Sequence, residues 1–453
     1  MSIVRPGDPR YDAASAGWNR SFQHRPAAVA QASTTAEVVE AVRAARAQGL
    51  QVAIQATGHG PAALAGDRAL LLCLRGMRQV HVDPRRAVAR VGGGARWTDV
   101  LGPAQDVGLA PLLGSSPQVG AVGYTLGGGI GWLARHHGLA VDSVRSLTVV
   151  LADGEVVVAT ALSEPDLFWA LLGGGAGSLG VVVAMEIALV PVDRVYAGNL
   201  LYPLEDADEV FALWHRWIED APAELTSAFN VSAFPDIDAV PAPFRGRRCA
   251  IIRGCHSTDS PEARAYVDRL RAWRRPEADL FGPIAFRQAA TISRDPDEPT
   301  PVCVTGRWLE SVDVSTVAAM TAAVEGGALF VEVRHAGGAV ARPNPAASYA
   351  ARDSDFLLQA VGVFDDDRAR SAGRRTFARL LTDTASQHAA RPAYLNFVDL
   401  DERQAAVGDA FGVDDLDRLG AVKRRVDPQN LFSCGIGLHP VRHGTNPPTQ
   451  EDT

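Results

Sequence analysis

The sequence predicts an α+β protein of about two domains. Its 453 residues exceed the usual size of one domain, which is roughly 100–200 residues. The first part mixes helical and strand patterns without a regular βαβ alternation, so a Rossmann fold is disfavoured. Beyond Val195, moderately alternating strands are separated by charged helices, which suits an antiparallel sheet with helices on one face.

The first elements form a small α+β unit. The segment 34–49 predicts a helix, capped by Thr34 or Thr35 and ended by Gly49, with Val38, Val39, Val42 and Ala45 along one face. The apolar run 52–54 predicts a strand that enters a loop. Further strands are expected at 69–74, 80–82 and 87–91, and another helix over 97–107.

The next stretch, 111–138, is rich in glycine and is expected to be loops. Residues 144–158 predict a hairpin that turns at Asp153-Gly154. A short helix over 166–172, a glycine loop at 173–180 and a strand over 181–190 complete the unit.

The second unit carries helices and longer strands. Helices are predicted over 205–217 and 261–273, and strands at 250–254, 302–309, 329–335 and 356–363. Trp308, Glu310, Glu332, Arg334 and His335 lie on these strands, but about half of such side chains face solvent, so no role follows for any one of them. We expect domains at 1–195 and 196–410, and a segment 411–453 that returns to the first domain, with a disordered tail after 441.

Composition excludes several classes of function. The net charge of −8 argues against a nucleic-acid or anionic-membrane partner. The 5 cysteines are scattered and lack the spacing of metal ligands, which predicts reduced thiols in a cytoplasmic protein without a metal site. The N-terminus has no apolar signal segment, and no apolar run is long enough to span a bilayer. The abundance of Ala, Arg and Gly is typical of a high-GC bacterium.

The segment Gln55-Ala56-Thr57-Gly58-His59-Gly60 is the most informative motif. Glycines on both sides of the histidine let the backbone approach a ligand closely, and successive amides in such a loop can form a nest for phosphate. A loop that only bound phosphate would need no imidazole. The histidine therefore suggests a covalent bond to the cofactor itself.

Further glycine-rich segments supply the rest of this predicted site. They read GSSPQVG at 114–120, GYTLGGGIG at 123–131 and GGGAGSLG at 173–180. So many glycines raise the entropic cost of folding, which a globular protein tolerates where the backbone lies against a flat or anionic group. Together with the histidine loop, these segments indicate a large nucleotide cofactor.

In this order the motifs resemble those of the vanillyl-alcohol-oxidase-type FAD enzymes, and among them the berberine-bridge-enzyme-like branch. The closing segments agree, with Tyr394-Leu395-Asn396 and DPQNLF at 427–432. The resemblance covers the first ~190 residues strongly and the last ~60 clearly, as expected when the cofactor domain is the better-marked part. It implies a PCMH-type FAD-binding domain followed by a substrate domain.

The resemblance also implies the site residues. His59 matches the histidine that bonds the 8α-methyl of the flavin. Ser116 stands where some relatives have a cysteine that makes a second bond, so a single bond is expected. Gln55 replaces the usual arginine. The expected cofactor contacts are Gln55, Ala56, Thr57, Gly58, His59, Gly60, Gly114, Ser115, Ser116, Gln118, Val119, Gly120, Gly123, Tyr124, Gly128, Gly129, Gly131, Val141, Gly180, Val181, Val182, Asn396 and Asn430.

By resemblance, the chemistry is hydride transfer from a C–H next to an amine or hydroxyl of a small molecule, often a secondary metabolite, with O2 reoxidising the flavin to give H2O2. Tyr394 is the first candidate for the catalytic base, with a core tyrosine as the alternative, and His439 and His137 follow it. A flavin-containing cyclase or isomerase and an inactive flavin-binding protein stay open as alternatives. The family also leaves a homodimer open.

Overall fold

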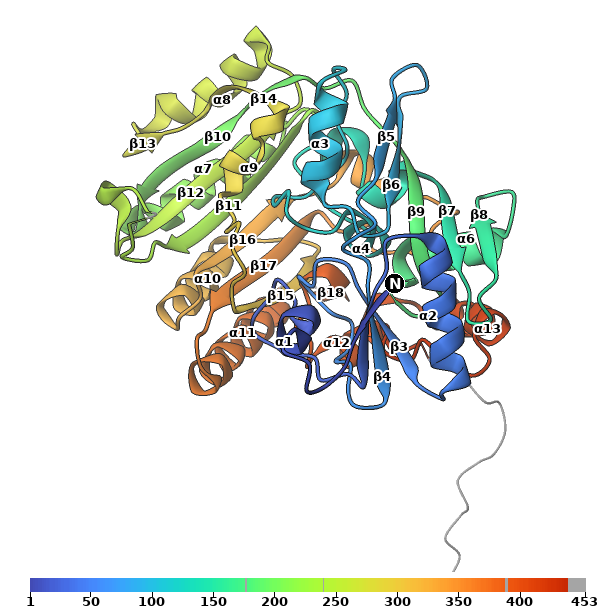
Figure 1. The fold of residues 1–453 in the computed structure, drawn as a ribbon. Helices are drawn as coiled ribbons and strands as arrows, with labels where there is room; N and C mark the ends of the chain where they lie inside the picture. The colour runs from blue at the N-terminus through green and yellow to red at the C-terminus, as the bar shows by residue number, and fades with distance from the viewer. Residues whose placement is uncertain (176, 239, 388–389, 439–453) are drawn as a thin grey trace, which may run out of the picture.

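The computed structural model describes residues 1–438 apart from 176, 239, 388 and 389, and in this part the strands form three sheets (Figure 1). The first has four strands, β1 (Ser2–Val4), β2 (Ala28–Gln31), β3 (Gln51–Gln55) and β4 (Ala69–Cys73). Their order is β1-β2-β4-β3, and β2 and β3 run parallel to β4. Because these three strands are parallel, the loop after β3 lies at the end of the sheet where their carboxyl ends meet.

Helix α2 (Thr35–Ala47) covers this sheet. Thr34 is its N-cap: its hydroxyl accepts a hydrogen bond from the Glu37 amide at 3.3 Å, and the Glu37 carboxylate accepts one from the Thr34 amide at 3.2 Å. This reciprocal pair satisfies donors that a helix start otherwise leaves free. The buried face is Val38, Ala41, Val42 and Ala45, close to the predicted stripe.

A five-stranded antiparallel sheet follows in the order β5-β6-β9-β7-β8. Its strands are β5 (Val80–Asp83), β6 (Val88–Gly92), β7 (Val144–Val150), β8 (Val156–Ala159) and β9 (Val181–Ala188). The predicted hairpin is β7–β8, and Gly154 in its turn has φ +83°, a conformation that favours glycine. Helices α3 (Trp97–Gln105) and α6 (Pro165–Gly174) flank this sheet.

The third sheet has nine strands and is antiparallel throughout. They are β10 (Arg194–Pro203), β11 (Leu225–Ala233), β12 (Arg248–His256), β13 (Ala278–Asp279), β14 (Gly282–Ala285), β15 (Val302–Leu309), β16 (Phe330–His335), β17 (Phe356–Val363) and β18 (Ala390–Ala393). Along the sheet the order is β13-β10-β12-β11-β16-β17-β15-β18, with β14 beside β10.

One face of the nine-stranded sheet is covered by α7 (Ala207–Ile218), α8 (Pro261–Trp273), α10 (Val314–Glu325) and α11 (Asp367–Gln387) (Figure 1). The other face packs against the first unit, where Trp308 and Leu357 share a buried cluster with Trp97 and Leu147. The predicted α+β architecture, with an antiparallel sheet covered by helices, is confirmed.

The chain end returns to the first unit. After α12 (Arg403–Ala410) and α13 (Val413–Val426), the Leu431 carbonyl accepts a hydrogen bond from the Val52 amide at 2.8 Å, and the Ile436 amide donates to Ser178 Oγ at 2.9 Å. The domain bounds at 195 and 410 stay predictions, and the predicted disorder after 441 lies outside the described residues.

Short helical segments were not predicted, because they carry one to two turns inside loop-like sequence. They are α1 (Tyr11–Ser15), α4 (Ala121–Leu126), α5 (Ala134–His137) and α9 (Ala290–Ser293), with 3-10 turns η1 (Ala140–Ser143), η2 (Leu204–Asp206), η3 (Ala242–Phe244), η4 (Phe286–Gln288), η5 (Gly338–Ala341) and η6 (Leu395–Phe397). Of these, α4 and η6 reach the site described next.

Candidate functional site

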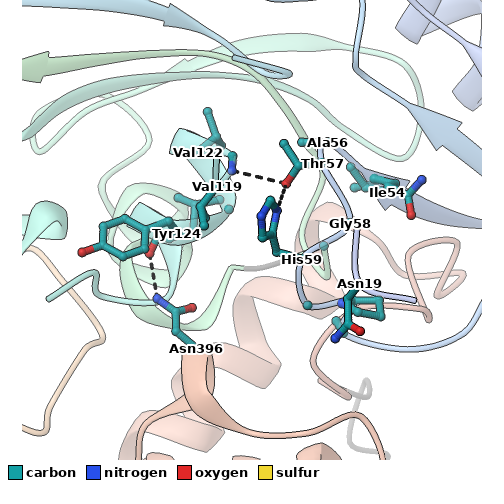
Figure 2. A pocket seen from close by; sticks show the side chains of 18 of the residues that line it. Asn19, Ile54, Ala56, Thr57, Gly58, His59, Val119, Val122, Tyr124 and Asn396 are labelled. Carbon is teal, nitrogen blue, oxygen red and sulfur yellow. Dashed lines mark hydrogen bonds between the residues drawn. The ribbon is translucent and has the colours of Figure 1, made fainter. Parts of the chain in front are cut away.

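A cavity of about 300 Å³ lies where the loop after β3 meets the glycine-rich segments and two inner strands, β15 and β16, of the nine-stranded sheet. Its walls come from residues 53–63, from parts of the segments 114–124, 177–182 and 396–403, and from Val304 on β15 and Arg334 on β16. Segments far apart in sequence therefore close around one space, and Figure 2 shows the part of it around His59.

The loop after β3 has a backbone that only glycine allows at Gly58. Its φ is +76°, and a Cβ there would lie 2.5 Å from Gly17 Cα. This close approach brings Trp18 next to the loop, where its indole stacks on the His59 ring with centroids 4.2 Å apart. The stacking fixes the plane of the imidazole.

One nitrogen of His59 is held and the other is free to react. Nδ1 lies 2.8 Å from Thr57 Oγ1 (Figure 2), whereas the buried Nε2 has no hydrogen-bond partner among the described residues. Burial, with the positive charge of Arg96 nearby, lowers the pKa of His59 to about 3. The ring is thus neutral at physiological pH, which is the nucleophilic form of imidazole.

The amides of residues 56–60 are also unused: in the part of the chain described above, none of them donates a hydrogen bond to a protein acceptor. The loop is half-buried to exposed and lines the cavity, so these donors are available to an acceptor from outside the chain. The loop, its glycines and the unpartnered histidine nitrogen therefore fit a phosphate-bearing cofactor that can also bond to His59.

The second glycine segment makes room for one aromatic side chain. A Cβ on Gly114 would lie 2.8 Å from the Tyr124 ring, and one on Gly129 would lie 2.5 Å from it. Tyr124 lines the cavity, and its buried hydroxyl finds no hydrogen-bond partner in residues 1–438 as described. The backbone carbonyl of Tyr124 accepts a hydrogen bond from Asn396 Nδ2 at 2.9 Å (Figure 2).

Most of the predicted cofactor contacts meet at this cavity. They are Gln55, Ala56, Thr57, Gly58, His59, Gly60, Gly114, Ser115, Ser116, Val119, Gly120, Gly123, Tyr124, Gly180, Val182 and Asn396. The others do not line it, namely Gln118, Gly128, Gly129, Gly131, Val141, Val181 and Asn430. Gly131 illustrates the difference, since its role is packing: a Cβ there would lie 1.9 Å from the Leu113 carbonyl oxygen.

Tyr394 also lies behind the cavity wall. It is 0% exposed, and its hydroxyl accepts hydrogen bonds from the amides of Gly129 and Ile130 at 3.0 and 3.1 Å and from Asn396 Nδ2 at 3.2 Å. Burial raises its pKa above the ordinary value. These contacts favour a role in holding the glycine loop, and the catalytic role stays a prediction. His439 lies outside the described residues. His137 is paired ring to ring with His136, away from the cavity lining.

One wall of the cavity carries a buried charge network. On β16, Glu332 accepts hydrogen bonds from Arg334 Nη2 at 2.6 Å and from Arg253 Nη1 at 3.0 Å. Arg334 lines the cavity and stacks over Trp132 at 4.5 Å. The two arginines lower the pKa of Glu332, which is 2% exposed. Positions 332 and 334 lie on the same face of a strand, because side chains alternate along it. The sequence shows this spacing, but the spacing alone does not tell whether that face is buried or exposed to solvent.

Other lining residues had no sequence signal. Asn19 and His24 come from the loop between α1 and β2, and Arg403 from the start of α12. Each is a lone polar residue outside any motif, so only the fold reveals its place. Ser116 lies at the cavity, and its Oγ accepts a hydrogen bond from the Gln118 amide at 3.4 Å. Ser115 Oγ donates to Asp295 at 2.5 Å.

Among the described residues, no group of His, Cys, Asp and Glu could hold a metal ion. No helix in the described part of the chain is both long and apolar enough to cross a membrane.

Two family models match the chain. The model of an FAD binding domain matches residues 26–160, and the model described as berberine and berberine like matches residues 393–435. The first range contains the histidine loop and the main glycine segments. The second contains Tyr394, Asn396 and both α12 and α13.

Known proteins similar to this chain are oxidoreductases. It is 26% identical to (R)-6-hydroxynicotine oxidase of Paenarthrobacter nicotinovorans over 449 residues, covering 97% of this chain and 96% of the relative. It is 34% identical to the carbohydrate oxidase of Microdochium nivale, over 43% of this chain and 40% of that one.

Among solved structures, 6-hydroxy-D-nicotine oxidase from Arthrobacter nicotinovorans superposes with a TM-score of 0.84 at 22% identity, covering 97% of this chain and 98% of the other. A berberine-bridge-like protein of Physcomitrella patens gives 0.82 at 21% identity, covering 98% and 97%. These likenesses identify the same fold.

Proposed function

We propose that this FAD-dependent oxidase belongs to the berberine-bridge-like family, holds FAD through a single covalent bond to His59 and oxidises a small molecule at a carbon next to an amine or hydroxyl. When bound, FAD supplies the hydride acceptor for this reaction. The proposal extends to O2 as the oxidant of the reduced cofactor and H2O2 as the second product.

The observation that carries the proposal is the state of His59. A neutral, half-buried imidazole whose buried Nε2 has no partner among the described residues leaves that nitrogen open to a ligand. The Trp18 ring holds its plane, and the amides of residues 56–60 in the same loop have no described acceptor. A covalently held flavin would occupy this position and explain each of these features.

A single bond is proposed because Ser116 lies at the cavity where a second attachment would need a thiolate. A serine hydroxyl has no accessible anionic form near neutral pH, so it does not replace cysteine as a nucleophile. The cavity-lining Cys434 is half-buried, and burial raises the pKa of its thiol.

The chain's own residues orient the reactants. Arg334 brings a positive charge to the cavity wall, and Glu332 holds its guanidinium in place. The Tyr124 hydroxyl can donate one hydrogen bond into the cavity, because burial keeps its pKa well above the ordinary value and it stays protonated. An alcohol substrate must lose an O–H proton, whereas a neutral amine need not.

The substrate class follows from the relatives only in outline. One is named for a hydroxynicotine, which is an amine, and another for a carbohydrate. A small molecule of either type, including a secondary metabolite, suits a cavity that already has to hold FAD. The location in the cytoplasm of a bacterium and the possible homodimer belong to this proposal.

The test combines flavin spectroscopy with a peroxide assay. Amines, sugars and alcohols would be added without O2, and a substrate should bleach the flavin absorbance; air should then restore the colour and release H2O2 in equal amount. Conversion of a compound with bleaching absent and no peroxide would favour a cyclase or isomerase. A native protein purified without flavin would contradict the proposal as a whole.

A further inference from the structure

Arg403 is a buried cation without an ion-pair partner. It begins α12, is 7% exposed and lines the cavity. Its Nη2 donates to the Val398 carbonyl at 2.9 Å, and its buried Nε finds no acceptor within the described part of the chain. Burial lowers its pKa to about 10, so the guanidinium is charged at neutral pH.

The neighbouring carboxylate, Asp399, forms its ion pair with Arg374, at 3.2 Å. Its negative charge also favours the charged form of Arg403, but no ion pair joins these two residues. The other arginine at the cavity, Arg334, contrasts with this, because Glu332 pairs with it at 2.6 Å. A buried charge without a counterion is strongly unfavourable. An anion from outside the chain would supply the direct partner that Arg403 lacks.

The position of Arg403 identifies where that anion would bind. Its Nη2 lies 3.6 Å from the place that a Cβ on Gly60 would occupy, so the guanidinium is next to the histidine loop. The amides of residues 56–60 have no described acceptor. The only titratable side chain of that loop, His59, is neutral at physiological pH. The loop thus offers hydrogen-bond donors, and Arg403 offers the formal charge.

We propose that Arg403 binds the diphosphate of FAD together with the amides of residues 56–60. A diphosphate carries at least two negative charges and many acceptor oxygens, which matches a guanidinium beside a row of amides. This inference rests on the proposed function, since it requires FAD. The proposal adds a cofactor-binding residue from the C-terminal segment, so that the start of α12 contacts the cofactor bound by the first unit.

The test separates the phosphate from the flavin ring. In a His59→Ala background, where no covalent bond can form, the Kd for FAD and for riboflavin would be measured by flavin fluorescence, with and without Arg403→Gln. Riboflavin has the ring but no phosphate. We expect Arg403→Gln to weaken FAD about 10- to 100-fold, as for a lost charge-assisted hydrogen bond, and to leave riboflavin unchanged. Arg334→Gln is the matched control and should show no such selectivity for FAD.

Thermal unfolding provides a second, independent readout. Arg403→Gln should lower the Tm of the FAD-loaded protein, because a phosphate contact is lost. It should leave the Tm of the FAD-free His59→Ala protein unchanged or higher, since an unpaired buried charge is removed. An equal drop in both forms, an equal loss of FAD and riboflavin, or an effect on substrate KM alone would each overturn the inference. Absence of FAD from the native chain would instead overturn the proposed function.

Discussion

Lys423→Met should destabilise the protein strongly, because it breaks a fully buried ion pair. Lys423 lies in the last turn of α13 and Asp427 is the residue that caps its C-terminal end, and both side chains are 0% exposed. Lys423 Nζ donates to Asp427 Oδ2 at 2.6 Å, to the Ser178 carbonyl at 2.8 Å and to the Phe432 carbonyl at 3.2 Å. An ammonium group has three donors, and all of them are used.

The magnitude follows from what the substitution leaves behind. Asp427 keeps its hydrogen bonds from the amides of Leu431 and Phe432, both at 2.8 Å, but loses its cation. Removing one partner of a buried ion pair typically costs about 3–5 kcal/mol, because the remaining charge stays in a medium of low polarity. We expect Lys423→Met to lower the free energy of unfolding by that amount.

The same substitution should loosen the cofactor site. The Ser178 carbonyl belongs to the glycine loop 173–180, in which Gly177 and Gly180 line the cavity. Lys423 links this loop to the C-terminal segment, because it donates hydrogen bonds to both the Ser178 and the Phe432 carbonyls. Loss of these hydrogen bonds should increase the rate at which non-covalent FAD dissociates from a His59→Ala protein, which flavin fluorescence would follow.

Urea unfolding of the full chain measures the first effect. Arg425→Met is the control, because Arg425 pairs with Glu164 at 2.8 Å while 50% and 38% exposed, and such surface pairs contribute at most about 1 kcal/mol. The double variant Lys423→Met with Asp427→Asn should recover part of the loss, since no charge is stranded. The reasoning is refuted if Lys423→Met unfolds at the same urea concentration as Arg425→Met.

Three further outcomes are expected. Ser116→Cys should give a fraction of protein with flavin on two peptides, whereas the native peptide map should carry it on His59 alone; a second native site would refute the single bond. Tyr394→Phe removes the acceptor of two loop amides, so its contacts predict a lower Tm and little change in the rate of flavin reduction; a fall of ~10²–10⁴ with flavin retained would restore the catalytic role. His335 has a pKa lowered from 6.5 to about 3 by burial and by Arg135, so the unfolded chain takes up its proton first as pH falls, and stability present above pH 6.5 is lost toward pH 3. His335→Gln should therefore recover about 2 kcal/mol of the loss between pH 6.5 and 5; an unchanged pH profile would show that His335 does not titrate in this way.

The sequence located the cofactor loops because local chemistry defines them. Gly58 and Gly154 adopt left-handed backbone conformations, which glycine favours. Thr34 and Glu37 form a capping box, which the spacing of the two residues in the sequence predicts. The histidine between two glycines marks a loop that approaches a ligand. Such features depend on a few neighbouring residues, so they can be predicted without knowledge of the fold.

The charged walls of the cavity could not be found in the same way. Arg403 carries no motif, and its lack of a counterion exists only because Asp399 is paired elsewhere. The place of Tyr394 behind the glycine loop depends on how β18 meets β15. These are long-range relations between segments, and a strand or helix pattern contains no information on them.

The central claim, a flavin bonded to His59, can be tested directly by mass spectrometry after acid precipitation. We predict that the pellet of the native protein is yellow and that one proteolytic peptide, the one containing His59, carries the added mass of FAD. His59→Ala should leave the pellet colourless and release its flavin into the supernatant. The account is contradicted if flavin is released from the native protein, or if the modified peptide lacks His59.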